Sequence, residues 1–257
     1  MYDRRNLYRT AQRRATDQVM KRCSLARIDD GVPLSGKIEG TPWESATPIT
    51  IDEFPWDVAA SKQATVVRPL YDADTLYLQY RVEDSHSYAA TTELNGPMWE
   101  DSCVELFATV EPRRRQTRSA RLPSPVSRNS TGRRPHYFNF EVNCVGTVRL
   151  GFGPDRDDRE VISADLADSI RVETSVEGPT KAESRDDKGW WVAVALPFET
   201  LAAFTGTAVA PTEGTVWRGN FHRLGGTTDP QYAAWNSGDA PEPEFHCPSA
   251  FGRLVFE

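Results

Sequence analysis

The stretch Trp99-Glu100-Asp101-Ser102-Cys103-Val104-Glu105-Leu106-Phe107 decides the fold of this chain. It begins with an aromatic residue in a loop and continues as a strand, and alternate residues of a strand point to opposite faces. One face is apolar and consists of Val104, Leu106, Ala108 and Val110, and the other consists of Cys103, Glu105, Phe107 and Thr109. The pattern therefore predicts that Glu105 points away from the main core, on the face that Trp99 can reach.

A flat ring beside a fixed carboxylate suits a polyol ligand. The C–H faces of a sugar stack on aromatic rings, and its hydroxyls donate to carboxylates. The alternative is a solvated strand face that happens to carry one Glu, as Glu105 would be. The pairing of Trp99 with Glu105 is thus a hypothesis for a binding site, and it needs support from the rest of the chain.

The composition limits the class of protein. A chain of 257 residues fits one large all-β domain or two small ones. Its 7 Trp, 8 Tyr and 11 Phe, with 18 Pro and 17 Gly, are typical of short strands joined by tight turns. The net charge of −7 argues against nucleic-acid binding. No apolar run approaches the roughly 18 to 20 residues of a membrane span, so we expect a soluble protein.

Short segments rich in β-branched and aromatic residues follow one another along the chain. We expect strands at residues 65–70, 75–83, 103–110, 137–144, 147–152, 169–176, 190–196, 216–223 and 252–257, and one short helix that begins near Pro197. There is no alternation of strands with long helices. The sequence therefore predicts an all-β fold, an antiparallel β-sandwich of two packed sheets of jelly-roll or immunoglobulin-like type.

Two basic segments of the chain differ from the body of the expected domain. Residues 1–33 are rich in Arg and are expected to be a basic N-terminal extension, helical in part, with no core of its own. The domain then spans residues 34–257. Within it, residues 112–135 carry eight Arg and no acid, which predicts a disordered insertion between adjacent strands. No secretory signal is recognisable, so the localisation stays open.

The four cysteines, Cys23, Cys103, Cys144 and Cys247, have no CxxC spacing and make no zinc signature. An even number permits disulfides, but Cys103 and Cys144 are expected on opposite strand faces. Free thiols, some of them buried, are the preferred interpretation.

Several motifs in register resemble the family 9 carbohydrate-binding modules. These are Lys37-Ile38-Glu39-Gly40 with Trp43, Tyr71-Asp72 before Leu76-Tyr77-Leu78, Trp99 to Phe107, Val194-Ala195-Leu196-Pro197-Phe198, and Phe251-Gly252-Arg253-Leu254. The resemblance extends from about residue 34 to residue 257. It implies a monomeric, non-catalytic β-sandwich of polysaccharide metabolism that binds a mono- or oligosaccharide between two aromatic side chains, often with structural calcium. It also suggests a periplasmic or extracellular protein.

The resemblance assigns the ligand-binding residues. The two aromatic residues of the slot correspond to Trp99 and Phe245, and the carboxylate corresponds to Glu105. A family strand with Arg and Asn two residues apart corresponds to Glu141 and Asn143, so an acid replaces the Arg. A polar donor corresponds to His222, beside Asn220 and Arg223.

The change at Glu141 removes a guanidinium with five donors. We hypothesise that Arg223 or His222 restores the missing donors. Trp235 is expected either to line the site or, as we prefer, to pack beneath it.

Candidate metal ligands are Asp72, Asp74 and Asp84, which crowd a turn and a strand end and whose oxygens suit calcium. Solvated turn acids are the preferred interpretation of the three. His222 and His246 lack a tight metal-binding motif and are expected to make ordinary polar contacts.

Two other functions remain open. A glycoside-processing enzyme would use Glu105 and Glu141 as its acid and base. A related group of sandwich domains binds haem through Met or His, and Met98 is the residue of this chain that could serve as an axial ligand.

Overall fold

The computed structural model describes residues 20–56, 61–110, 135–180, 182–183 and 186–257. The strands are β1 (Arg22–Arg27), β2 (Ile49–Ile51), β3 (Thr65–Tyr71), β4 (Thr75–Val82), β5 (Cys103–Thr109), β6 (Tyr137–Asn143), β7 (Val148–Gly153), β8 (Glu160–Val161), β9 (Arg171–Thr174), β10 (Trp190–Pro197), β11 (Val216–Leu224), β12 (Tyr232–Ala234) and β13 (Gly252–Phe256). The α-helices are α2 (Ala164–Ala167) and α3 (Phe198–Thr205), and the 3-10 helices are η1 (Pro42–Ser45), η2 (Met98–Glu100) and η3 (Pro248–Ala250).

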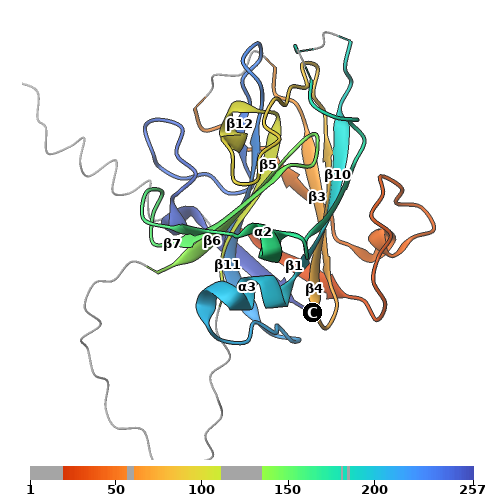
Figure 1. The fold of residues 1–257 in the computed structure, drawn as a ribbon, viewed down its shortest axis with the longest axis vertical. Coiled ribbons are helices and arrows are strands. Elements are labelled where there is room, and N and C mark those ends of the chain that lie inside the picture. Colours follow the sequence, from red (N-terminus) through yellow and green to blue (C-terminus); the bar gives the residue numbers. More distant parts are fainter. Residues whose placement is uncertain (1–19, 57–60, 111–134, 181, 184–185) are drawn as a thin grey trace, which may run out of the picture.

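All strands belong to one mixed sheet with the order β8-β7-β6-β5-β11-β13-β1-β3-β4-β10-β9. Figure 1 shows the curled ribbon of this sheet. β12 pairs with β11, and β2 pairs with β3. We call the part from β8 to β13 the β5 half and the part from β3 to β9 the β4 half. β1 joins them, because its first residues pair in parallel with β13 and its last two with β3.

The main core lies between the two halves of the sheet. Val104 and Leu106 of β5 belong to the same buried cluster as Leu78 and Tyr80 of β4. The Tyr80 hydroxyl donates to the backbone carbonyl of Glu105 at 3.2 Å, across this core. The predicted division of the 103–110 strand into an apolar and a polar face is therefore confirmed.

This architecture fits a β-sandwich, with two corrections to the sequence-based expectation. The halves are joined by β1 into one sheet, and the sheet is mixed because β1 runs parallel to both neighbours. α3 occupies the segment where a helix was expected, but α2 is an additional helix that the sequence did not indicate.

Each expected strand is present, within a few residues of its predicted bounds. The short strands β1, β2, β8 and β12 were missed. β1 lies inside the segment that we expected to be a basic extension, yet Cys23 and Leu25 are buried in the main core. The sheet therefore begins at Arg22, ahead of the expected boundary at residue 34. Residues 1–19 and almost all of the Arg-rich segment 112–135 lie outside the described residues.

A second apolar cluster covers the outer face of the β4 half. Trp43 of η1 is fully buried there and packs with Leu70, Tyr77 and Ala193. The sequence predicts core or turn positions for four Trp residues, Trp43, Trp190, Trp191 and Trp217. Trp43, Trp190 and Trp217 are buried, whereas Trp191 is partly buried and packs against this second cluster.

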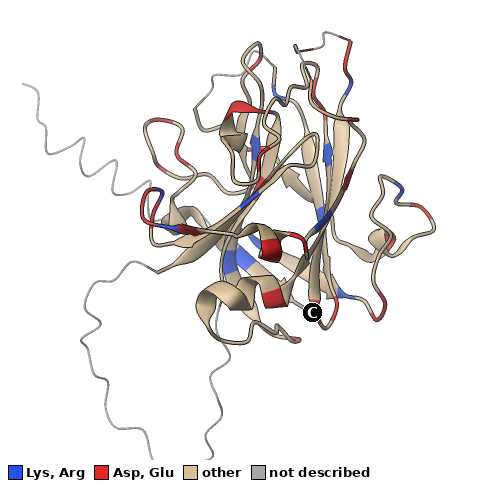
Figure 2. Ribbon diagram, in the orientation of Figure 1, with Lys and Arg blue, Asp and Glu red and all other residues tan. Residues whose placement is uncertain are grey.

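All four cysteines are free thiols, three of them buried, as expected. Among the described residues, none of the helices has both the length and the apolar character that crossing a membrane requires. Figure 2 shows that many acidic residues lie on loops and helices, whereas several strands carry basic residues. Arg149 in β7 and Arg223 in β11 are two of these strand residues.

Candidate functional site

A cavity of about 660 Å³ opens on the outer face of the β5 half. Its volume lies within the usual range for small-molecule sites, about 300 to 1,000 Å³. Strands β5 and β6 supply Glu105, Phe107, Asn139 and Glu141 to its floor, and the surrounding walls include Trp99, Arg149, Arg156, Arg159, Tyr232, Phe245 and His246. Trp99, Glu105, Glu141 and Phe245, which were predicted separately from the sequence, are thus brought together.

Glu105 and Glu141 lie side by side on the floor. They are directly opposite each other in the β5–β6 ladder, and only 3 % of each residue is exposed. Burial raises the pKa of Glu105 to about 8. Burial, and then the neighbouring Glu105, raise the pKa of Glu141 to about 8. Both carboxyl groups are therefore largely protonated at neutral pH, so each offers an O–H donor as well as acceptors.

His222 extends this row to the next strand. It lies opposite Glu105 in the β5–β11 ladder, and its Nδ1 is 3.2 Å from Glu105 Oε2. Burial lowers the pKa of His222 to about 3, so its imidazole is neutral. The ring of Phe245 stacks on this imidazole at 4.2 Å between centroids and 11° between planes. One face of Phe245 therefore covers His222, and His222 lies beneath the wall of the cavity.

Arg149 provides the guanidinium that position 141 lacks. It lies opposite Glu141 in the β6–β7 hairpin, and its Nε is 3.7 Å from Glu141 Oε1. Its guanidinium also lies 5.5 Å from the centre of the Trp99 ring. The hypothesis that Arg223 or His222 takes the place of the missing Arg is therefore replaced, because the donors come from the neighbouring strand.

The sequence contained a signal for Arg149. In an antiparallel hairpin, one step back along the first strand faces one step forward along the second. Val142 faces Val148 across the turn. The same register places Arg149 opposite Glu141.

Asn139 and Arg159 were also missed. The Asn139 side chain donates to Glu141 Oε1 at 2.6 Å and accepts from the Arg159 guanidinium. Asn139 could have been found from its parity with Glu141. Arg159 comes from the loop before β8, for which the sequence gave no register. His246, for which ordinary polar contacts were expected, makes one with the Tyr137 hydroxyl at 2.8 Å.

Trp99 is the exposed aromatic residue of the site. It lies in η2, with 52 % of its surface exposed, whereas its neighbour Met98 is fully buried. An exposed ring at the edge of a cavity offers a flat apolar face to a ligand. The position at the end of a loop was expected from the sequence.

Asn143 and Asn220, two expected ligand-binding residues, are not among the lining residues of the cavity. Asn143 is buried, donates to the carbonyl of Thr91 and to Asp101, and accepts from the backbone of Thr147. Asn220 donates to the carbonyl of Asn236 and accepts from its N–H. Both amides therefore stabilise turns and loops.

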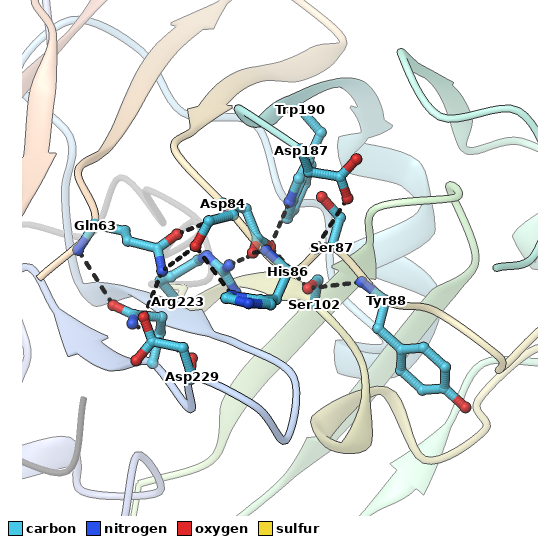
Figure 3. A network of polar contacts seen from close by, with 12 residues as sticks. Gln63, Asp84, His86, Ser87, Tyr88, Ser102, Asp187, Trp190, Arg223 and Asp229 are labelled. Carbon is cyan, nitrogen blue, oxygen red and sulfur yellow. Dashed lines mark hydrogen bonds and ion pairs between the residues drawn. The ribbon is translucent and has the colours of Figure 1, made fainter. Parts of the chain in front are cut away.

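Arg223 points to the opposite side of the sheet from His222. Its Nη2 donates to Asp84 Oδ2 at 2.5 Å, and its guanidinium lies 5.6 Å from the centre of the Trp190 ring, in the network that Figure 3 shows. It therefore cannot reach the cavity. Trp235 is buried and packs against Phe221 at 6.0 Å, which confirms the preferred interpretation of packing beneath the site.

The three acids proposed for calcium do not converge. Asp72 accepts from the N–H groups of Asp74 and Thr75 and from the Tyr77 hydroxyl. Asp84 lies beyond the other end of β4 and is engaged by Arg223. Calcium requires six to eight oxygen ligands around one point, so these residues do not fit a shared calcium site.

The haem alternative depended on Met98. This residue is fully buried against Cys103 and Leu224 and is not among the residues that line the cavity. Its thioether is therefore not positioned to reach a cofactor in that space.

A family model described as carbohydrate-binding family 9 matches residues 42–116 and 128–256. The chain belongs to carbohydrate-binding family 9. Residues 117–127 of this chain are not matched by the family model, and they lie within the Arg-rich segment 112–135.

Solved structures share the fold of this family 9 chain. A protein from Bacteroides uniformis, for which carbohydrate binding has been suggested, has 24 % identity and a TM-score of 0.75, with 93 % of this chain and 100 % of that chain covered. A family 9 module from Caldicellulosiruptor kristjanssonii in complex with glucose has 12 % identity and a TM-score of 0.54, with 92 % of this chain and 96 % of that chain covered. A family 9 module from the same organism in complex with cellotriose has 12 % identity and a TM-score of 0.54, with 92 % of this chain and 94 % of that chain covered. No match was found among curated protein sequences.

Proposed function

We propose that the cavity binds a mono- or oligosaccharide without catalysis, with Trp99 as the main stacking surface. The observation that carries the proposal is the row of polar side chains from adjacent strands, Arg149, Glu141, Glu105 and His222, beside an exposed Trp. The family 9 module with glucose or cellotriose bound supports the choice of ligand class.

The chemistry of the floor suits a polyol. A protonated carboxyl group both donates and accepts, the Arg149 guanidinium donates, and the Asn139 amide fixes Glu141 in place. A sugar ring presents hydroxyls that need donors and acceptors around its edge and C–H groups that need an aromatic face. The floor offers the first, and Trp99 offers the second.

Phe245 is the proposed second wall of the slot. It lines the cavity and is half-buried, its ring stacks on His222, and the ring centroid of Trp56 lies 5.4 Å away at a tilt of 56°. Because these two neighbours hold the ring, it needs little ordering on binding. His222 contributes by positioning Phe245 and Glu105.

The arrangement of the two acids favours binding over hydrolysis. An oxygen of Glu105 lies within 4.8 Å of one of Glu141, near the roughly 5 to 5.5 Å of retaining glycosidases. However, both acids project from one sheet face, so both meet a ligand from the same side rather than flanking a glycosidic bond. A nucleophile must also be ionised, whereas burial keeps both groups protonated.

The test is isothermal titration of the full chain with glucose, xylose, cellobiose and cellotriose, with and without calcium. We expect weak, saturable binding of at least one sugar in the micromolar to millimolar range, because exposed hydroxyls must lose water. Trp99→Ala should abolish it.

Leu166→Ala is the matched control, because Leu166 is an exposed apolar residue of α2 that does not line the cavity. Binding that survives in Trp99→Ala, or no binding across the panel by a folded protein, would overturn the proposal.

A further inference from the structure

The floor of the cavity gathers sulfur, oxygen and nitrogen donors from three adjacent strands. Cys103 and Glu105 are two residues apart in β5 and share one face, and Glu141 lies opposite Glu105 in β6. One ligand atom from each of these three residues lies within 4.8 Å of the others. Within the part of the chain that the structure describes, this is the group of three such residues close enough to hold a metal ion.

Three polar atoms in this cluster have no hydrogen-bond partner. They are Glu105 Oε2, Glu141 Oε2 and His222 Nδ1, and each belongs to a side chain that is at least 96 % buried. Although His222 Nδ1 lies 3.2 Å from Glu105 Oε2, the pair lacks hydrogen-bond angles. Buried polar atoms without partners are uncommon in folded proteins, and each such atom calls for a ligand, a water or a proton.

We propose that Cys103, Glu105 and Glu141 bind a zinc-type divalent transition-metal ion through three protein ligands, with the fourth position left open. Thiolate, imidazole and carboxylate are the ligands of zinc sites, which are usually four-coordinate. Calcium and magnesium take oxygen ligands and would leave the thiol unused. The donor set therefore selects a transition metal over the calcium that the family resemblance implies.

The surroundings balance the charge of such a site. The ion displaces the thiol proton and the two carboxyl protons when it binds. The three negative charges that result are neutralised by the divalent ion and the neighbouring Arg149 guanidinium. Arg149 and Asn139 both contact Glu141 Oε1, which leaves Oε2 free for the ion. Asn139 in turn is held by Arg159. Hydrogen-bonded partners of this kind orient the ligands of metal sites.

The cavity provides the entry path. Glu105 and Glu141 line it, whereas Cys103 and His222 lie deeper. An ion would therefore reach the carboxylates first and the thiolate last. The sequence could not indicate this site, because its ligands lie on separate strands and make no short spacing motif.

The first experiment uses the full chain, treated with a chelator and then titrated with Zn²⁺ or Co²⁺. We expect one ion per chain. The cobalt form should show a thiolate-to-metal charge-transfer band, which reports directly on a cysteine ligand and needs no variant. This readout is independent of sugar binding, so the metal site and the proposed function can fail separately.

Variants then identify the ligands. Cys103→Ser should remove the charge-transfer band. Glu141→Gln should weaken Zn²⁺ binding at least about 100-fold, since the loss of a residue that only hydrogen-bonds a metal ligand already costs about 10- to 100-fold. Cys144→Ser is the matched control, because Cys144 is equally buried but outside the cluster, and it should keep both the band and the affinity.

Two results would overturn the inference. The first is a folded wild-type protein that binds no stoichiometric Zn²⁺ or Co²⁺, in which case protons alone neutralise the two acids. The second is a charge-transfer band that persists in Cys103→Ser. Should Cys103→Ser fail to fold, Glu141→Gln and the wild-type cobalt spectrum still decide the question.

Discussion

Two buried polar centres lie on opposite faces of the same strands, and they differ in how well their carboxylates are satisfied. Neighbouring residues of β11 supply one group to each, His222 to the cavity floor and Arg223 to the network around Asp84. In that network, shown in Figure 3, Asp84 accepts from the His86 N–H, the Ser102 hydroxyl, the Trp190 indole and the Arg223 guanidinium. On the floor, Glu105 and Glu141 each keep one oxygen without a partner.

The difference separates a structural centre from a binding centre. The Asp84 carboxylate accepts from these four donors and is closed to solvent, so it fixes how the end of β4 meets β11, while Nε and Nη1 of Arg223 have no hydrogen-bond partner. The acids of the floor open into a cavity and leave bonding capacity unused. Because these unpartnered oxygens lie beside a cavity, a ligand or an ion can reach them.

Removing Arg223 should have the largest effect. Arg223→Met leaves the buried Asp84 without its counter-charge, and breaking a buried pair in this way costs about 3 to 5 kcal/mol. Urea denaturation followed by Trp fluorescence measures the free energy of unfolding. Arg253→Met, at an exposed strand position, is the control. A loss of less than about 1 kcal/mol for Arg223→Met would show that the network is not structural.

The cavity floor should make the metal-free protein less stable as pH rises. The folded-state pKa values of Glu105 and Glu141 are raised from 4.5 to about 8, so between these values the folded state binds more protons than the unfolded state. The contribution of these two groups to the free energy of unfolding is therefore largest below about pH 4.5. It falls by a few kcal/mol as pH rises to about 8. Denaturation midpoints from pH 5 to 8.5 in the presence of a chelator measure this slope. A flat profile would contradict the assignment of raised pKa values.

Replacing Glu141 should separate stability from binding. Glu141→Leu removes a buried acid that lacks a partner for one oxygen, so at pH 8 we expect stability to be unchanged or higher by about 1 kcal/mol. The same change removes a hydrogen-bonding group from the floor, and sugar binding should weaken about tenfold. A strong loss of stability would show that Glu141 has a structural role, as Asp84 does.

Arg149 should have the smallest effect of the set. Its side chain is partly exposed and contacts Glu141 at 3.7 Å, so Arg149→Gln should alter the free energy of unfolding by less than about 0.5 kcal/mol. The loss of its donors should weaken sugar binding by about three- to tenfold. Titration of this variant beside Arg253→Gln provides the measurement, and equal affinities in the two variants would exclude Arg149 from the site.

Parity along the strands was the most informative part of the sequence. It placed Glu105 on the outer face, and it also contained the information that Arg223 points inward, since Arg223 pairs with Val104 of the core face. The mistaken assignment of Arg223 as a ligand came from treating neighbours on one strand as one group. Asn220 does share the face of His222, but its amide is occupied by Asn236, a contact between distant segments that parity cannot show.

Other features depended on long-range pairing. β1 was hidden because its Arg residues resemble a solvated tail, and only Cys23 and Leu25 point inward. Arg159 reaches the cavity from a loop, and Phe245 from a long segment between β12 and η3, so no strand register fixes either of them. The resemblance to family 9 located Phe245, whereas periodicity could not.

β1 is the strand that joins the two halves of the sheet, because it pairs with both β13 and β3. A chain that began after Arg27 would lose the strand between β13 and β3 and would leave both with unpaired backbone groups where β1 had been. Open edges of this kind pair readily with strands of another molecule. Because residues 22–27 contribute one short strand, the same segment donated by a second molecule could close the gap, so loss of this segment by proteolysis would favour strand exchange and aggregation.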